Sequence, residues 1–443
     1  MRENLLKQYW RMLFLFPLVS GILVVVLGCV FNPAFVKRYI SSDHHLESGT
    51  ATRIALLEAF VILVGLALIL FARFIRVYTP KKEKAISNFL IICFSTGFTL
   101  ILVEIGLKVL DLPRNRPRHA FFQYDATLGW THQPKKDAFF KDVRVQINAN
   151  GLRDTDITYQ KPNGEFRILF LGDSQLFGDG VSAEETFASL LERKLNAAQA
   201  INAGIIGYGT DQQLLFLKKD GVKYAPDLIV VTLNAYDFQD NVSETIRSGY
   251  AKPVFKIEGG NLSLTNVPVP NFDIVERLDR RLRNMSHLYY FMGSHLESFM
   301  NRGANEGKHT YDPGAILLKP VQLESSVTIT QRILKEIAQV GQTVNAKTIV
   351  VFLPYEMDFG SDLNYRRQID HISHALDKYS QGNGFLFLDI RAELAKVQQT
   401  PLYQDTMHFN REGHKVAAQV LERRFIELDV IPKVHQVGGH ENH

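Results

Sequence analysis

One serine stands where the chain is expected to pass from a strand to a helix. Ser174 lies in FRILFLGDSQLFGDGV (residues 166–181), where a short apolar run ends at Gly-Asp-Ser. The next residues, Ser182-x-x-Glu185, form a capping-box pattern that predicts a helix starting near Ala183. Such a turn exposes the hydroxyl at the carboxyl edge of a parallel sheet, beside free backbone N–H groups. Ser174 is therefore a candidate nucleophile, although Gly-Asp-Ser is also a common turn composition.

A carboxylate and an imidazole that could activate this serine lie much further along the chain. Asp405 and His408 are three residues apart in YQDTMHFNREGH (residues 403–414), just before an amphipathic segment at 412–428. A single turn could bring the carboxylate to the imidazole Nδ1–H and leave Nε2 facing outward. Taken alone, the pair could equally be a helix cap and a surface histidine. Together with Ser174, it predicts a Ser-His-Asp triad for acyl transfer through a covalent intermediate.

Several blocks of the chain resemble the SGNH (GDSL) hydrolase family, in particular its membrane-anchored bacterial members. Gly172-Asp173-Ser174 is similar to the first block, Asn202 to Gly207 (NAGIIG) to the second, and Asp405 to His408 (DTMH) to the last. The resemblance implies that Ser174 is the nucleophile and that the N–H groups of Ser174 and Gly207 form part of the oxyanion hole. It also implies a reaction that needs neither a metal nor an organic cofactor.

The third block departs from the family pattern. The family has an Asn-Asp pair at the end of the third strand, and the Asn side chain completes the oxyanion hole. Here the predicted strand at 228–237 has Tyr236 before Asp237, and the nearest asparagine is Asn234. Both side chains would share one face of a strand. The amide chemistry favours Asn234 as the third donor, whereas the register favours Tyr236, and both stay open here.

Three long apolar segments precede this region, at 10–31, 54–74 and 86–110. Each is long enough to cross a hydrocarbon core of about 30 Å, so they predict three transmembrane helices. The first lacks a small-residue cleavage site and is expected to remain as an anchor. Basic residues precede the first segment and cluster between the second and third, which predicts a cytoplasmic location for both regions. The remainder of the chain would then lie on the extracytoplasmic side of the cell (inner) membrane.

Two carboxylates fall within these predicted spans. Glu58 and Glu104 are candidates for a function there, because an intramembrane carboxylate is costly. The alternative for Glu104 is a structural pair with Lys108, one turn further on. The only cysteines, Cys29 and Cys93, also fall in predicted spans, so the remainder of the chain holds no disulfide.

The distribution of these features predicts four regions. Residues 1–110 form the membrane anchor, 111–164 a stalk with a small β-rich lead-in, 165–428 the catalytic domain, and 429–443 a flexible tail. Alternating strands and helices predict an α/β domain with a doubly wound parallel sheet. The resemblance implies a flavodoxin-like three-layer α/β/α arrangement. The rhythm breaks at about 241–317, which predicts an insertion that either contacts substrate or serves as a structural cover.

These features predict a membrane-anchored extracytoplasmic serine esterase or deacylase. The resemblance implies an acylated cell-envelope glycan or lipid as substrate, with envelope-biosynthesis proteins as further partners. An O-acyltransferase that acylates a surface polysaccharide is one alternative, and a non-catalytic binding or assembly protein is another. The formal net charge of +4 in 443 residues gives no indication of nucleic acid as a partner. The tail histidines His435, His440 and His443 are interpreted as part of a frayed end, and no metal site is predicted.

Overall fold

The computed structural model describes residues 84–431, apart from 113–114, 117, 196–197, 247–248, 272–273, 302–317 and 398–400. It also describes scattered positions between 18 and 70. The chain divides into two compact units, a smaller one of Met1–Pro113 with Arg281–Met300 and a larger one of Arg114–Arg280 with Asn301–His443. The predicted tail lies almost entirely outside the described residues.

A parallel five-stranded sheet forms the centre of the larger unit. Its strands are β5 (Phe166–Gly172), β6 (Ala198–Gly204), β7 (Leu228–Leu233), β10 (Lys347–Phe352) and β11 (Leu386–Asp389), and their spatial order is β11-β10-β7-β5-β6. Counted along the chain this is the order 2-1-3-4-5, which reverses direction between β5 and β7. Open α/β sheets bind ligands at the carboxyl ends of the strands at such a reversal.

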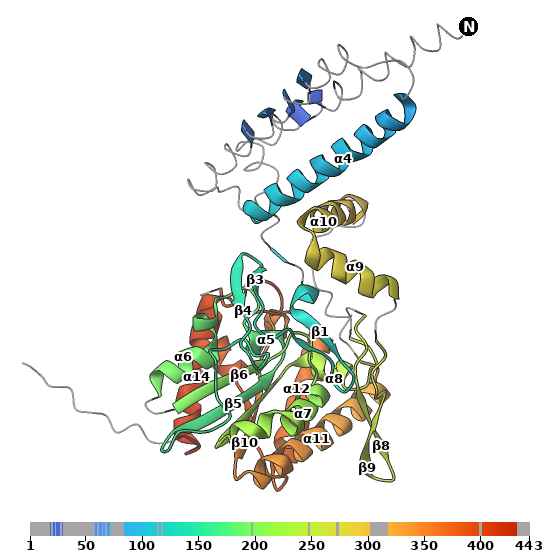
Figure 1. The fold of residues 1–443 in the computed structure, drawn as a ribbon. Coiled ribbons are helices and arrows are strands. Elements are labelled where there is room, and N and C mark those ends of the chain that lie inside the picture. Colours follow the sequence, from blue (N-terminus) through green and yellow to red (C-terminus); the bar gives the residue numbers. More distant parts are fainter. Residues whose placement is uncertain are drawn as a thin grey trace, which may run out of the picture. The chain divides into compact units, whose positions relative to one another are not determined.

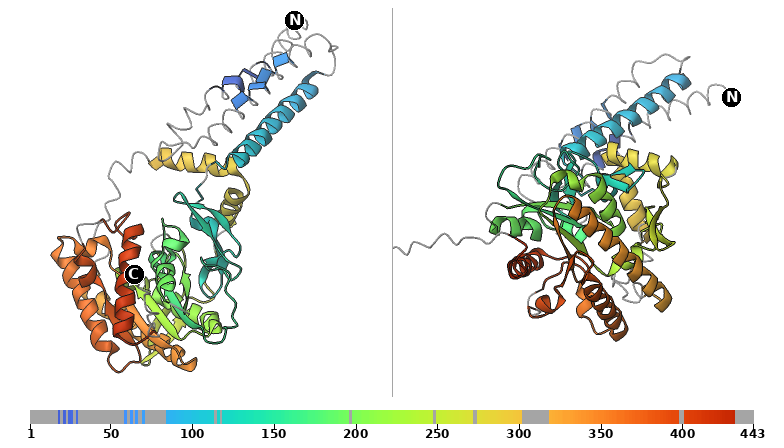
Figure 2. Two further views of the ribbon diagram at one scale, coloured as in Figure 1. Left: turned by 90° about the vertical axis from the view of Figure 1, so that its left-hand side faces the viewer. Right: turned by 90° about the horizontal axis from the view of Figure 1, so that it is seen from below.

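Helices cover both faces of this sheet (Figures 1 and 2). One face is covered by α6 (Phe187–Lys194), α13 (Arg391–Ala395) and α14 (Arg411–Glu427). The other is covered by α7 (Thr210–Lys219), α8 (Ala235–Asp240), α11 (Pro320–Thr343) and α12 (Leu363–Ser380), with the short turns η3 (Gly221–Tyr224) and η5 (Glu356–Phe359) nearby. The predicted α/β fold with a parallel sheet is therefore confirmed.

The alternation of side chains along β5 explains why both faces must be covered. Ile168 and Phe170 belong to the apolar cluster under α6 and α14, whereas Leu169 and Leu171 belong to the cluster under α7 and α11. All four side chains are essentially inaccessible to solvent. A strand that is apolar on both faces is typical of the centre of a parallel sheet.

The turn after β5 differs from the prediction in one respect. The capping box of Ser182 and Glu185 is present, but it starts the short turn η2 (Ala183–Glu185), and α6 begins only at Phe187. Ser174 itself opens a one-turn helix, α5 (Ser174–Phe177), which the sequence pattern did not predict. This helix forms because the Asp173 side chain accepts the Gln175 N–H, and it ends because Gly178 adopts a positive φ.

The lead-in consists of a short turn and two antiparallel hairpins. The turn η1 (Arg118–Phe121) precedes β1 (Phe122–Asp125) and β2 (Gly129–His132), which are followed by β3 (Asp137–Phe140) and β4 (Val143–Gln146). The indole of Trp130 on β2 is fully buried, and its Nε1–H donates to the Ile206 carbonyl oxygen over 3.1 Å. The β2 hairpin is thus anchored to the loop that follows β6.

The predicted insertion contains a hairpin and two helices. The hairpin pairs β8 (Val254–Glu258) with β9 (Asn261–Thr265) around Gly259 and Gly260, as predicted. The helix predicted at 275–300 is divided into α9 (Ile274–Met285) and α10 (His287–Asn301).

The smaller unit explains the position of this division. Glu104, on α4 (Lys84–Val109), accepts hydrogen bonds from Ser286 Oγ at 2.8 Å, His287 N at 3.0 Å and Leu288 N at 2.9 Å. The carboxylate satisfies free N–H groups at the start of α10, where negative charge is favourable. Glu104 also forms the expected ion pair with Lys108 at 3.3 Å, so its structural role is visible.

The structure does not test the predicted membrane anchor. Among the residues that the structure describes, none of the helices combines the length and apolar character needed to cross a membrane. The segments at 10–31 and 54–74 lie mostly outside those residues, whereas α4 overlaps the segment at 86–110. The three spans and the role of Glu58 therefore stay predictions.

Candidate active site

Ser174, His408 and Asp405 lie next to one another. Ser174 Oγ is 2.9 Å from His408 Nε2, and His408 Nδ1 is 2.9 Å from both carboxylate oxygens of Asp405. If Nδ1 carries the proton and donates it to Asp405, Nε2 is free to accept the Ser174 hydroxyl proton. This is the hydrogen-bond pattern of a nucleophile, a general base and an orienting carboxylate.

The Asp405 carboxylate is held in its ionised form. Burial alone would raise its pKa, but hydrogen bonds from the His408 side chain and from the Met407 and His408 N–H groups outweigh burial. Together they keep the pKa of Asp405 well below its usual range. An ionised Asp405 fixes the imidazole tautomer and favours the imidazolium that forms when His408 takes a proton.

A buried glutamine fixes the histidine loop relative to the serine. Gln175 follows the nucleophile and donates from Nε2 to the Pro354 carbonyl oxygen at 3.1 Å. Its Oε1 accepts the Phe409 N–H at 3.2 Å, one residue beyond His408. Asn410 then starts α14, accepting the Gly413 N–H at 2.9 Å. Gln175, next to Ser174, and Phe409, next to His408, therefore hold the two catalytic residues close to each other.

The structure corrects the expectation that Asn234 and Tyr236 share a strand face. Strand β7 ends at Leu233, and Asn234 is the N-cap of α8. The Asn234 side chain accepts the Tyr236 N–H at 2.9 Å, and Asp237 Oδ2 accepts the Asn234 N–H at 2.8 Å. This reciprocal capping box starts a helix where the sequence pattern had been interpreted as a continuing strand.

The Asn234 amide is held in one orientation. Its Oδ1 accepts the Tyr355 hydroxyl at 2.5 Å in addition to the Tyr236 N–H, so the NH₂ group lies on the opposite side. There it donates to Asp173 Oδ2 at 2.9 Å, adjacent to the nucleophile. An amide nitrogen has two hydrogens, and Asp173 accepts one of them. The Tyr236 ring packs against Tyr355, with 5.6 Å between ring centroids.

Gly207 follows β6 in a left-handed backbone conformation. Its φ is +83°, a value that a residue with a Cβ rarely adopts. A Cβ at this position would lie 3.0 Å from Ile246 Cδ1. Glycine therefore allows the chain to turn at this position after β6.

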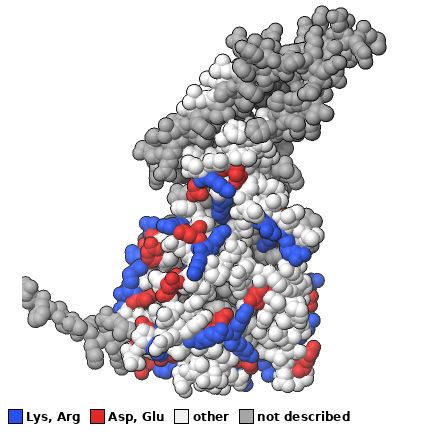
Figure 3. Space-filling view, in the orientation of Figure 1, with Lys and Arg blue, Asp and Glu red and all other residues white. Residues whose placement is uncertain are grey.

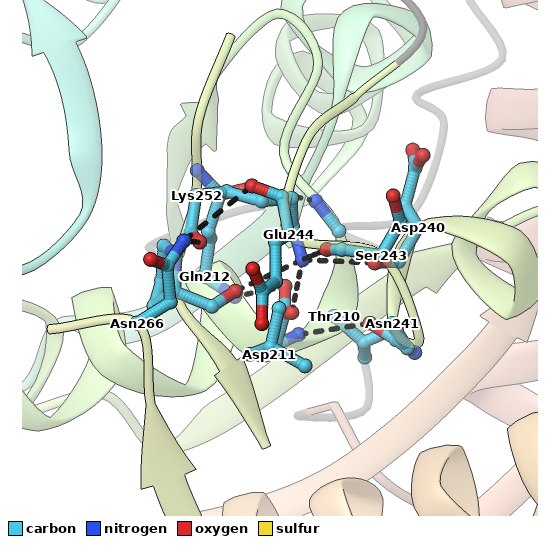
Figure 4. A network of polar contacts seen from close by, with 12 residues as sticks. Thr210, Asp211, Gln212, Asp240, Asn241, Ser243, Glu244, Lys252 and Asn266 are labelled. Atoms are coloured by element: carbon cyan, nitrogen blue, oxygen red, sulfur yellow. Dashed lines mark hydrogen bonds and ion pairs between the residues drawn. The ribbon is translucent and has the colours of Figure 1, made fainter. Parts of the chain in front are cut away.

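A buried polar network includes Thr210, Asp211 and Asn241 (Figure 4). Asp237 accepts the Thr210 hydroxyl at 3.0 Å, and Thr210 Oγ1 accepts from Asn241 Nδ2 at 3.0 Å. Asn241 Oδ1 in turn accepts the Asp211 N–H at 3.2 Å. The network thus connects the start of α8 with the start of α7.

The same network binds the beginning of the insertion. Lys252 is fully buried, pairs with the Asp211 carboxylate, and donates to the backbone oxygens of Asp240 at 2.9 Å and Pro253 at 3.0 Å. Its charge is therefore compensated and its donors are used. The structure gives Lys252 a structural role in holding the insertion against α7 and α8.

A buried arginine of the lead-in holds the loop that follows the nucleophile. Arg153 donates from Nη1 to the carbonyl oxygens of Phe177 at 2.9 Å and Gly178 at 2.6 Å, and from Nη2 to that of Val181 at 2.6 Å. The only sequence signal was an arginine in the NGLRD segment before the first strand. The lead-in is thus part of the support of the site.

Two further charged residues near the triad were not predicted. Asp179 is buried, with Oδ2 3.7 Å from His408 Nε2, and Lys141 of the lead-in contacts both Asp179 and Asp405. An aspartate between two glycines in FGDG was the only signal for Asp179. Nothing local marked Lys141, because its contacts depend on the folded position of the β3–β4 hairpin.

The charged side chains on one face and the potential metal ligands among the described residues do not indicate a further site. Basic and acidic side chains are intermixed on the described part of the face seen in Figure 3. Within the described ranges, no group of three His, Cys, Asp or Glu side chains could hold a metal ion. His435, His440 and His443 lie outside those ranges.

Sequence comparison identifies the family. The profile of the GDSL-like Lipase/Acylhydrolase family matches residues 170–416, more than half of the 443-residue chain. The chain belongs to the GDSL-like lipase/acylhydrolase family. This GDSL-like lipase/acylhydrolase is a serine hydrolase that acts on ester bonds, as the resemblance implied. No curated protein sequence matches it significantly.

Solved structures similar to this GDSL-like lipase/acylhydrolase are distant in sequence. A catalytic mutant of Axe2, an acetylxylan esterase from Geobacillus stearothermophilus, is 15% identical, with a TM-score of 0.34 over 60% of this chain and 95% of that chain. A lipolytic G-D-S-L protein from Veillonella parvula is 12% identical, with a TM-score of 0.34 over 59% and 98%. A putative lipolytic protein of the same family from Desulfitobacterium hafniense is 11% identical, with a TM-score of 0.35 over 58% and 99%.

Proposed function

We propose that this GDSL-like lipase/acylhydrolase is a membrane-anchored serine esterase that removes O-acyl groups from a cell-envelope glycan or lipid outside the cytoplasm. The observation that supports the catalytic part is the 2.9 Å contact between Ser174 Oγ and His408 Nε2, with Asp405 on the other side of the ring. It brings together residues more than 200 positions apart in the sequence, in the order of proton transfer that ester cleavage requires.

In the proposed reaction, Ser174 Oγ attacks the ester carbonyl carbon while His408 Nε2 takes the hydroxyl proton. The tetrahedral intermediate collapses as His408 returns this proton to the leaving alcohol, and an acyl-enzyme remains. Water then attacks the acyl group with His408 again as the base, which releases the acid and restores the Ser174 hydroxyl. Asp405 stays ionised throughout and stabilises the imidazolium.

The oxyanion is proposed to face three donors, which are the N–H groups of Ser174 and Gly207 and the side-chain amide of Asn234. Their elements support this assignment, because Ser174 opens α5 after β5 and Asn234 opens α8 after the neighbouring β7. Each donor of this type contributes on the order of 3 kcal/mol to the stability of the transition state. The orientation of the Asn234 amide is the reason for preferring it to Tyr236.

The membrane anchor rests on the three apolar segments and on one contact within the smaller unit. A Cβ added to Gly21 would lie 2.7 Å from the Gly65 carbonyl oxygen, and one added to Gly65 would lie 2.8 Å from that of Gly21. Transmembrane helices pack through small residues that allow their backbones to approach closely. Reporter fusions after Lys84 should show a cytoplasmic location, and fusions after Gly164 the opposite side. A cytoplasmic signal after Gly164 would exclude an envelope substrate.

Transfer of the acyl group to a sugar hydroxyl is the main alternative to hydrolysis, because the same acyl-enzyme serves both reactions. The test uses the full-length protein in detergent with p-nitrophenyl acetate and a fluorophosphonate probe. We expect ester cleavage that Ser174→Ala abolishes, and a phosphonate adduct on Ser174. Adding an oligosaccharide acceptor then measures how the acyl group divides between water and sugar. An adduct on another serine would refute the assignment, and absence of both cleavage and labelling would favour a non-catalytic protein.

A further inference from the structure

Asp179 is a buried carboxylate beside the catalytic nitrogen of His408. Its side chain is inaccessible to solvent, and its Oδ2 lies 3.7 Å from His408 Nε2. Its Oδ1 lies 2.7 Å from Lys141 Nζ. In the described part of the chain, no donor with hydrogen-bond alignment reaches either oxygen, so the contact with Lys141 is an ion pair. An isolated buried carboxylate is costly. Lys141 is the cation in direct contact with Asp179, and Arg153 also interacts electrostatically with it.

Lys141 reaches this position from the turn between β3 and β4. Lys141 and Asp142 form that turn with φ values of 49° and 63°. The ammonium group of Lys141 also lies 3.4 Å from Asp405 Oδ2, so it contacts the carboxylates on both sides of the His408 ring. The Gln404 side chain donates to the Asp179 carbonyl oxygen and joins the two loops that carry these carboxylates.

The arrangement has an electrostatic consequence for His408. A carboxylate within about 4–6 Å favours the charged imidazolium, and His408 has one at each nitrogen. A general base must instead be neutral when the substrate binds. Asp173 and His414 also interact electrostatically with His408, but Lys141 is the cation that contacts the carboxylates on both sides of the ring.

We propose that Lys141 is a positioning residue that keeps His408 available as a neutral base by offsetting the charge of Asp179, while Asp179 stabilises the imidazolium formed during the reaction. This inference rests on the proposed function, because it says which residues control the protonation of His408 in the same active site. The β3–β4 hairpin of the lead-in thus contributes directly to the chemistry of the catalytic unit.

The test is the pH dependence of kcat/KM for p-nitrophenyl acetate, measured with the full-length protein. Lys141→Met removes a cation, so proton uptake by the His408–Asp179 pair becomes easier. We expect the acidic limb of the profile to move to higher pH by about 1 unit. Asp179→Asn removes an anion and should move the limb in the opposite direction. The double variant restores the charge balance and should return the limb close to its original position.

Two controls separate charge from structure. Lys141→Arg keeps the cation and should leave the limb in place. A role of Lys141 in packing alone would not predict that Lys141→Met and Asp179→Asn move the limb in opposite directions. Lys135→Met removes an exposed lysine that also has a positive φ, 59°, but forms no ion pair with these carboxylates, so it should not move the limb.

Three results would overturn the inference: an unchanged limb in Lys141→Met, a shift to lower pH in that variant, or the same shift in Lys141→Met and Asp179→Asn. Thermal unfolding of each variant identifies profiles that are distorted by a loss of folding. If Lys141→Met does not fold, Asp179→Asn still tests the charge, because it must move the limb to lower pH. If the unmodified protein shows no Ser174-dependent cleavage, the proposed function itself fails. Cleavage that depends on Ser174 but gives identical profiles for all variants refutes only the role of Lys141.

Discussion

The Asn234 side chain donates to the Asp173 carboxylate over 2.9 Å, across the two strands between which the sheet reverses direction. Asp173 precedes the nucleophile, and Asn234 occupies the N-cap of the helix that follows the neighbouring strand. The contact fixes an amide N–H group beside Ser174 before any substrate is present. A donor that is oriented in advance needs no reorganisation when the oxyanion forms.

We expect Asn234→Ala to lower kcat by about 10²-fold or more with little change in KM, because the lost interaction is made mainly in the transition state. Tyr236→Phe should have a smaller effect, since it removes only the hydroxyl of a ring that packs on Tyr355. Steady-state kinetics with a model ester would measure both. The reverse ranking would assign the third donor to Tyr236, and two unaffected variants would leave backbone groups as the only donors.

The triad should behave as one unit. Ser174→Ala and His408→Ala are each expected to abolish nearly all turnover, and Asp405→Ala should be somewhat milder. The double variant of Ser174 and His408 should be little worse than either single one, because the first substitution already removes the pathway that the second would impair. Initial rates corrected for the amount of folded protein give the comparison. Losses that multiply would show that the two residues act independently.

Lys252→Met is expected to lower the free energy of unfolding by about 3–5 kcal/mol, because it leaves Asp211 buried without its cation. Adding Asp211→Asn should recover part of that loss, since the uncompensated charge is removed. Lys256→Met, on the strand β8 that follows Lys252, is the matched control. Lys256 is exposed, and its ion pair with Glu244 is long, at 3.8 Å. Its removal should therefore change the free energy of unfolding by no more than about 0.5 kcal/mol. Equal effects at the two lysines in denaturant unfolding would contradict the structural role of Lys252.

Asp358 should make stability depend on pH. Burial raises the pKa of Asp358 to about 7, although hydrogen bonds from the Tyr365 hydroxyl and the Tyr355 N–H oppose this. In the unfolded chain an aspartate titrates near pH 4, so between about 4 and 7 the folded state binds the extra proton. Its contribution to stability is therefore complete below about pH 4 and is lost as the pH rises through about 7.

Asp358→Asn should accordingly make the free energy of unfolding depend less on pH. The slope should differ most from that of the unmodified protein between the unfolded and the folded pKa of Asp358. Denaturant unfolding at several pH values measures it. Asp240 and Glu192, whose pKa values burial also raises to about 7, will retain their own contributions. A variant whose stability falls with pH as steeply as the unmodified protein would show that Asp358 does not bind the proton.

The sequence by itself determined the parts of the site that depend on local chemistry. Ser174, Asp405 and His408 were found because each lies in a short motif whose residue types suit one role, and the parallel sheet was predicted because apolar runs alternate with amphipathic segments. The start of α8 was missed although its signal was also local. Asn234 and Asp237 form a capping box, but the preceding β-branched run favoured a continuing strand.

Only the tertiary structure decided which charged residues surround the triad. Lys141 and Asp179 are separated by two strands and a one-turn helix, and Lys141 and Asp405 by most of the larger unit. No spacing in the sequence therefore relates them. Likewise, Glu104 caps a helix that begins more than 180 residues later. Interactions of this kind depend on where separate elements meet after packing, whereas motifs and periodicity report only the neighbours of each residue along the chain.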